Sequence, residues 1–190
     1  TCREAPYTVV VPIGSEPHDG TARIAVELGP ITRITLNRPA HANALDVEMG
    51  HELEQALALA ARQPELRVIV LAAAGKHFCA GGDFAFIAET AQLDRERVRE
   101  RMLRFYRTYL SVLDAPVPTI ALVQGSAIGA GLCLALACDV RVAARSARLG
   151  ANFLRVGLHP GMGATALLPH VVGAARATRL LATAEVVPAE

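Results

Sequence analysis

The feature that most constrains this chain is a glycine-rich turn between an apolar strand and an apolar helix. We expect the strand over Thr119–Val123, the turn over Gly125–Gly131 and the helix over Leu132–Ala137. A continuous apolar strand is typical of a parallel sheet that is covered on both faces. A helix that is apolar on every side must be buried all round. The pattern therefore predicts an α/β protein built around this turn.

Small residues at the start of a buried helix leave its first amides accessible. These amides have no partner inside the helix, and they lie at the positive end of its dipole. They suit a carbonyl oxygen that becomes negative during a reaction. The alternative is that the glycines serve only close packing. This stretch alone does not decide between the two interpretations.

A second turn of small residues follows another apolar strand. The strand is expected over Arg67–Ala72 and the turn over Gly75–Asp83, just before a short helix. Two such turns can supply two amides that converge on one oxygen. The pair of turns favours the catalytic interpretation over simple packing.

Taken together, these segments resemble the crotonase, or enoyl-CoA hydratase/isomerase, family. The matching segments are Phe78–Asp83, Gly125–Gly131 and Gly157–Gly161, with Ile34–Pro39 and Asn43–Leu45 similar to the family's entry motif. They occur in the family order, and the combination is specific although each segment alone is weak. The resemblance implies an α/β fold with a crotonase-like ββα spiral core and flanking helices. This core is expected over residues 21–190, after an irregular amino-terminal extension over residues 1–20.

The resemblance also implies a site. In the family, the amides that correspond to Gly82 and Ala130 form the oxyanion hole for an acyl thioester. The residues expected around coenzyme A are Ala42, Ala44, Gly82, Asp83, Phe84 and Ala85, mainly through their main-chain groups. Coenzyme A would enter as part of the substrate, with no permanently bound cofactor and no metal. The implied partners are the acyl-CoA substrate and further copies of the chain, in a homotrimer or a dimer of trimers.

Hydratases of the family use two glutamates that this chain lacks. Counting from Ala130, the first glutamate position is Cys133, and counting back from Gly157, the second is Phe153. We interpret Cys133 as a core residue and Phe153 as a wall of the pocket. His159 is the best-placed histidine for proton transfer, because histidine titrates near neutral pH; its alternative role is as a loop residue that caps the next helix.

Three functions are therefore considered. The first is an acyl-CoA enzyme of the family that stabilises a thioester enolate but is not a simple hydratase. The second is a decarboxylase of CoA- or carrier-protein-linked acyl groups, because Ala151–Phe153 and Pro160–Thr165 look like a decarboxylase branch of the family. That branch relies on a lysine after the first glycine turn, and Lys76 is the last lysine here. The third is a non-catalytic paralogue that binds acyl-CoA.

Composition agrees with a soluble enzyme. A chain of 190 residues, 52% of them hydrophobic, predicts one domain with a large core. The net charge of +1 argues against a nucleic acid or a membrane surface as partner. No signal-peptide hydrophobic region is found within Thr1–Gly20, and the four cysteines lack zinc-ligand spacing. We expect reduced thiols and a cytoplasmic location, and we expect the family's carboxy-terminal helical part to be absent.

The remaining elements follow from hydrophobic periodicity and turn signals. Strands are predicted over Arg23–Leu28, Ile31–Leu36, Leu66–Ala72, Val140–Ala144 and Leu149–Asn152. Helices are predicted from a cap at Asn43 or Asp46 to about Arg62, and over Phe84–Glu89, Asp94–Leu113, Pro160–Val172 and Ala174–Ala182.

Overall fold

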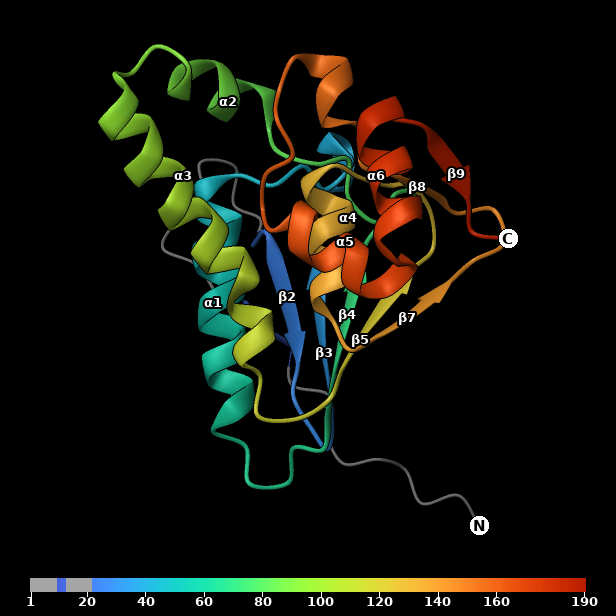
Figure 1. Ribbon diagram of the computed structural model, residues 1–190. Helices are drawn as coiled ribbons and strands as arrows, with labels where there is room; N and C mark the ends of the chain where they lie inside the picture. The colour runs from blue at the N-terminus through green and yellow to red at the C-terminus, as the bar shows by residue number, and fades with distance from the viewer. Residues whose placement is uncertain (1–9, 13–21) are drawn as a thin grey trace.

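The computed structural model describes residues 10–12 and 22–190, which form two sheets flanked by helices (Figure 1). The larger sheet has the order β1-β2-β3-β4-β5-β7 and the smaller one β6-β8-β9. The strands are β1 (Val10–Pro12), β2 (Ile24–Glu27), β3 (Ile31–Leu36), β4 (Val68–Ala73), β5 (Thr119–Val123), β6 (Ala127–Ile128), β7 (Val140–Ala143), β8 (Arg148–Gly150) and β9 (Val186–Pro188). Strands β1 to β3 pair antiparallel, whereas β3, β4, β5 and β7 pair parallel.

The helices gather on one side of the larger sheet. They are α1 (Val47–Ala61), α2 (Phe84–Thr90), α3 (Arg95–Leu110), α4 (Ala130–Ala137), α5 (Ala164–Val172) and α6 (Ala174–Thr183), with short 3-10 helices over Pro39–His41, Ser111–Asp114 and Asn152–Val156. In Figure 1, α1 and α3 lie side by side near β2, and α4 to α6 lie in front of β4 and β5. Helix α2 and the start of α3 stand away from the sheet in Figure 1.

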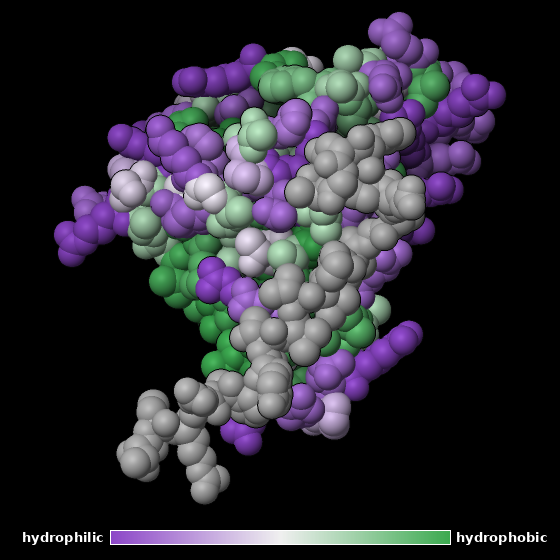
Figure 2. Space-filling view, turned by 180° about the vertical axis from the view of Figure 1, so that it is seen from behind, coloured by the Kyte–Doolittle hydropathy of each residue, from purple (hydrophilic) through white to green (hydrophobic). Residues whose placement is uncertain are grey.

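The sheet is buried on the face that meets these helices. Ile34, Leu71 and Ala121 are paired across β3, β4 and β5, so their side chains share one face, and all three are buried. The opposite face carries Ile120 and Val140, of which Val140 is 47% exposed. Figure 2 shows the hydrophobic surface on this back face. The prediction that β5 is buried on both faces is therefore wrong, because the described helices cover only one.

The prediction that the helix after the glycine turn is buried on every side is confirmed by α4. All eight of its residues are buried, although it is one of the shorter helices. Its apolar sequence has no polar face to turn toward solvent, so burial on all sides is the stable arrangement. It begins within the glycine turn and holds its own first amide, that of Ala130, in a fixed position.

The segment between β8 and α5 differs from the prediction. The expected strand over Leu149–Asn152 ends at Gly150, and a 3-10 helix follows over Asn152–Val156. Helix α5 begins at Ala164, because Met162 and Gly163 have φ angles of 49° and 71° in the left-handed region. These two residues therefore turn the chain where a helix from Pro160 was predicted.

The two ends of the chain also carry unexpected strands. Val10–Pro12 forms β1 and pairs with β2, where an irregular segment was predicted, and the other positions of residues 1–20 lie outside the described residues. Strand β9 pairs antiparallel with β8 and places Val187 opposite Leu149. Among the described helices, none is both long and apolar enough to cross a membrane.

Candidate active site

The parallel pairing of β3, β4 and β5 brings the loops after these strands to one edge of the sheet. The loops after β3 and β4 then pair with each other through their backbones. The N–H of Ala80 donates to the carbonyl of Ala42 at 3.0 Å, and the N–H of Leu45 donates to the carbonyl of Gly81 at 2.8 Å. The N–H of Asp83 in turn donates to the carbonyl of Leu45 at 2.8 Å. These bonds fix the backbone on either side of Gly82.

The loop after β4 pairs equally closely with the glycine turn after β5. The N–H of Cys79 donates to the carbonyl of Ser126, and the N–H of Ile128 donates to the carbonyl of Cys79, both at 3.0 Å. Glycine is required where the two turns meet. A Cβ atom at position 131 would lie 2.5 Å from the carbonyl oxygen of Cys79, closer than real Cβ contacts occur. The glycines that the sequence singled out therefore serve the close approach of two backbones.

Two amides remain free where these turns meet. Gly82 and Ala130 both line one cavity, and Ala130 is the first residue of α4. Within the described residues, neither N–H donates to a backbone acceptor. The Ala130 amide also lies at the positive end of the α4 dipole. The two groups are thus available to an oxygen atom of a ligand.

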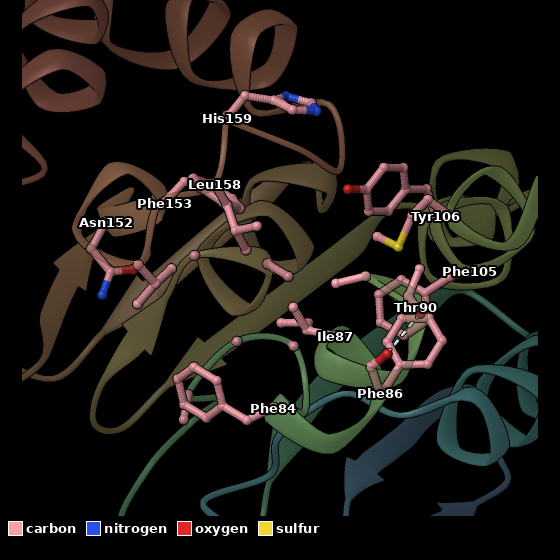
Figure 3. A pocket seen from close by; sticks show the side chains of 18 of the residues that line it. Phe84, Phe86, Ile87, Thr90, Phe105, Tyr106, Asn152, Phe153, Leu158 and His159 are labelled. Atoms are coloured by element: carbon pink, nitrogen blue, oxygen red, sulfur yellow. Dashed lines mark hydrogen bonds between the residues drawn. The ribbon is translucent and has the colours of Figure 1, made fainter. Parts of the chain in front are cut away.

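The cavity beside these amides has a volume of about 300 Å³ and is mainly apolar (Figure 3). Its apolar walls come from α2, α3 and the segment after β8: Phe84, Phe86, Ile87, Val98, Met102, Phe105, Phe153, Val156 and Leu158. No aspartate, glutamate, lysine or arginine of the described residues lines it. Such a cavity suits an uncharged acyl group.

Cys133 and Phe153, where the resemblance led us to expect hydratase glutamates, have the predicted surroundings. Cys133 is only 1% exposed, and burial raises the pKa of its thiol to about 12. It therefore stays protonated at neutral pH and is a core residue. Phe153 lines the cavity, and its ring lies about 4 Å from where a Cβ atom at Gly129 would be. Its predicted place as a wall of the pocket is confirmed.

Four polar side chains line the cavity: Thr90, Tyr106, Asn152 and His159. The Thr90 hydroxyl already donates to the carbonyl of Phe86 at 2.7 Å. His159 is exposed at the rim, with its Nδ1 atom 3.1 Å from the Pro160 carbonyl oxygen (Figure 3). Among the described residues, no group of three or more His, Cys, Asp or Glu side chains is arranged to hold a metal ion.

The residues predicted to contact coenzyme A lie in the paired loops and at the start of α2, and two of them line the cavity. Gly82 lines it, as does Phe84, which is 72% exposed. Ala42 and Ala44 are half-buried, and the cavity lining includes neither of them. Their carbonyls accept from the Ala80 amide and from Nη1 of Arg38. They remain predictions as coenzyme A contacts.

Asp83 and Ala85 lie outside the lining; Asp83 is the N-cap of helix α2, and Ala85 is the second residue of that helix. The Asp83 carboxylate caps this helix by accepting from the Ala85 N–H at 2.9 Å, and it accepts from Nη1 of Arg38 at 3.1 Å. Burial raises the pKa of Asp83, but the Ala85 amide and the Arg38 guanidinium outweigh this effect and lower it. Asp83 is therefore charged at neutral pH and anchors the loop that carries Gly82.

Asn43 holds the site through backbone hydrogen bonds that the sequence analysis did not predict. The buried Asn43 donates to the carbonyls of Ala74 and His77, both at 2.9 Å, and accepts from the N–H of Arg38 at 2.8 Å. Its expected alternative role as a helix cap falls to Asp46, which accepts from the Met49 N–H. Asn43 has a φ of 53°, a conformation that asparagine tolerates better than most residues.

Tyr106 on α3 lines the site although the sequence analysis did not single it out. It lines the cavity and presents a phenol to it. Its spacing could have indicated this position. Tyr106 stands four residues after Met102, and residues at that spacing lie on the same side of a helix. Arginines surround it in the sequence, and they favour the interpretation of a solvated face.

Comparison with known proteins identifies the family of this chain. The sequence model described as enoyl-CoA hydratase/isomerase matches residues 28–190, so the chain belongs to this family. A relative from Mycobacterium tuberculosis, named as a probable enoyl-CoA hydratase, is 41% identical over 143 residues, covering 75% of this chain and 55% of the relative. The chain thus spans little more than half the length of that relative.

Solved structures confirm the predicted crotonase fold. The enoyl-CoA hydratase of Bacillus anthracis superposes with a TM-score of 0.80 at 36% identity, covering 88% of this chain and 65% of that one. An enoyl-CoA hydratase from Polaromonas gives a TM-score of 0.81 at 34% identity, covering 87% and 65%. Both likenesses extend over most of the described residues.

Proposed function

We propose that this protein binds acyl-CoA thioesters and stabilises the enolate form of the thioester. The observation that carries the proposal is the pair of free amides, Gly82 and Ala130, at the wall of an apolar cavity. Donors fixed before the reaction stabilise a developing oxyanion without reorganisation. The adjoining loops, including Ala42, Ala44, Asp83 and Ala85, would hold the coenzyme A portion. Coenzyme A would bind and dissociate as part of the thioester substrate or product, and not as a permanent cofactor.

We further propose that the reaction is not simple hydration. Hydration requires a water molecule that is held and deprotonated while a proton is delivered to carbon. Cys133 has a buried, protonated thiol and Phe153 excludes water from its side of the cavity. None of the described lining residues carries a carboxylate. Enolate stabilisation is the chemistry that remains.

Removal of one amide tests the proposal. In the variant Ala130→Pro the N–H at position 130 is absent, whereas proline is tolerated in the first turn of a helix. Calorimetric titration would compare butyryl-CoA, a ground-state thioester, with acetoacetyl-CoA, which ionises to an enolate. We expect the enolate ligand to lose more affinity than the thioester. Equal losses for both ligands would contradict the oxyanion assignment.

Decarboxylation is a second candidate, because the cavity lining described here contains no lysine or arginine. A carboxylate that is placed among apolar side chains loses solvation, and release of carbon dioxide relieves that cost. Incubation with malonyl-CoA and measurement of acetyl-CoA would test it. If the protein binds acyl-CoA but neither releases carbon dioxide nor exchanges α-hydrogens, the third candidate holds, a non-catalytic binding protein.

We also propose a cytoplasmic protein that assembles as a homotrimer or a dimer of trimers. Apolar side chains of α4, α5 and α6 leave a groove of about 230 Å³, which includes the exposed Val171. An apolar groove of this kind gains stability when another chain covers it. Light scattering at micromolar concentration should give a trimer or hexamer mass. A monomer would contradict the assembly.

A further inference from the structure

Tyr106 is a polar group inside the cavity to which the proposed function assigns no role. It comes from α3, where it directly follows the buried Phe105 and precedes the buried Tyr109. Figure 3 shows its hydroxyl directed away from α3 toward the open part of the cavity, opposite Phe153 and Leu158. A phenol in this place faces the space that an acyl group would fill.

The backbone of the segment after β8 fixes the position of this hydroxyl. A Cβ atom at position 161 would lie 2.2 Å from the Tyr106 oxygen, so only glycine leaves room for the phenol. The N–H of Met162 is directed at the same oxygen. The thiol of Cys133 is 3.8 Å from the Gly161 carbonyl and lies close enough to influence the phenol. The hydroxyl therefore stands beside a position that hydratases of the family fill with a glutamate.

We propose that Tyr106 is a catalytic proton donor that protonates the α-carbon of the thioester enolate. The inference rests on the proposed function, which supplies the enolate at the Gly82 and Ala130 amides. In this step the O–H bond of Tyr106 breaks and its electron pair stays on the phenolate oxygen. The C=C electron pair of the enolate forms the new C–H bond at the α-carbon, an oxygen lone pair restores the neutral thioester carbonyl, and the negative charge ends on the phenolate. Water then returns a proton to the phenolate.

The surroundings of the phenol suit a donor. Burial raises its pKa, the nearby Cys133 adds to this effect, and the Met162 N–H opposes it. The group is thus protonated at neutral pH and ready to donate. The other polar side chains of the described lining are less suited, since the Thr90 hydroxyl is already engaged and His159 is exposed at the rim.

Exchange of α-hydrogens tests the inference. In mildly alkaline deuterium oxide, where some phenolate forms, the reverse of the proposed step carries deuterium into bound butyryl-CoA. Mass spectrometry and NMR would follow incorporation at one of the two α-hydrogens. Loss of a general acid or base typically costs about 10²- to 10⁴-fold, so Tyr106→Phe should slow exchange by that factor. Butyryl-CoA binding should change little, since the ring is retained.

Tyr109→Phe provides the matched control on the same helix. The Tyr109 hydroxyl donates to the carbonyl of Asp46 at 2.6 Å, and the residue does not line the cavity. This variant should exchange like the unmodified protein. If Tyr106→Phe also exchanges normally while Ala130→Pro does not, the role of Tyr106 is refuted and the proposed function stands. If the unmodified protein binds butyryl-CoA without exchange, the inference is overturned; if it does not bind any acyl-CoA, the proposed function fails.

Discussion

Substitution of Gly131 by alanine should disturb the contact between the two glycine turns. The added Cβ atom would lie 2.5 Å from the Cys79 carbonyl oxygen and 2.7 Å from its sulfur, whereas ordinary contact begins at 3.4 Å. One backbone must therefore retreat by about 0.9 Å, the difference between those two oxygen distances. Overpacking of this kind typically costs about 1–3 kcal/mol of stability.

The same retreat should displace the free amides. Cys79 lies three residues before Gly82, and Gly131 directly follows Ala130, so the displacement reaches both N–H groups. A misplacement of about 1 Å can cost about 10²-fold in a reacting geometry. Urea denaturation would measure stability, and calorimetry with acetoacetyl-CoA would measure the site.

Gly29→Ala is the control for this experiment. A Cβ atom there would have its nearest neighbour at 4.0 Å, and the residue lies outside the cavity lining. We expect it to behave like the unmodified protein in both measurements. If Gly131→Ala is as stable as Gly29→Ala and binds the enolate ligand as tightly, the reasoning about the packed turns is refuted.

Three further predictions concern residues around the site. Asn43→Ala should lower the free energy of unfolding by about 3 kcal/mol, because three backbone groups lose a partner at about 1 kcal/mol each. Urea denaturation measures this, and an unchanged midpoint would contradict it. Asp83 has a lowered pKa, so its charge stabilises the fold above its ordinary pKa, and this contribution is lost as the pH falls through the lowered value. Asp83→Asn should therefore destabilise at neutral pH but not in acid, and an equal effect at both would refute the ion pair. The double change Cys133→Glu with Phe153→Glu should give trace hydration of crotonyl-CoA if the carboxylates alone are missing, and activity no higher than that of either single variant would contradict this.

The glycine turns could be predicted because their chemistry is local. Gly125–Gly131 follows an apolar strand and precedes an apolar helix, and only small residues allow the approach seen between Cys79 and Gly131. The same local logic placed α1, whose cap is Asp46. In a parallel sheet, the loops that follow neighbouring strands lie at the same edge of the sheet. The two glycine turns follow two such strands, so the site was expected where these turns meet.

The features that sequence reasoning missed depend on contacts between distant segments. Tyr106 reaches the cavity because Gly161, 55 positions later, leaves room for its hydroxyl. Strand β9 exists because β8 offers it a partner, and its three residues carry little signal alone. The turn at Met162 requires a left-handed conformation that methionine rarely adopts, so local preference pointed to a helix instead.

We propose that this site holds an acyl-CoA and its enolate without the residues that hydration requires. The most direct measurement follows the loss of enoyl-thioester absorbance of crotonyl-CoA, with calorimetry to show that the ligand is bound. Without a general base for water, the rate should be lower than that of an enoyl-CoA hydratase by at least about 10²- to 10⁴-fold. Binding of crotonyl-CoA with this slow rate is the predicted result. Rapid hydration by the unmodified protein would contradict the claim and would require an acid and base outside Cys133 and Phe153.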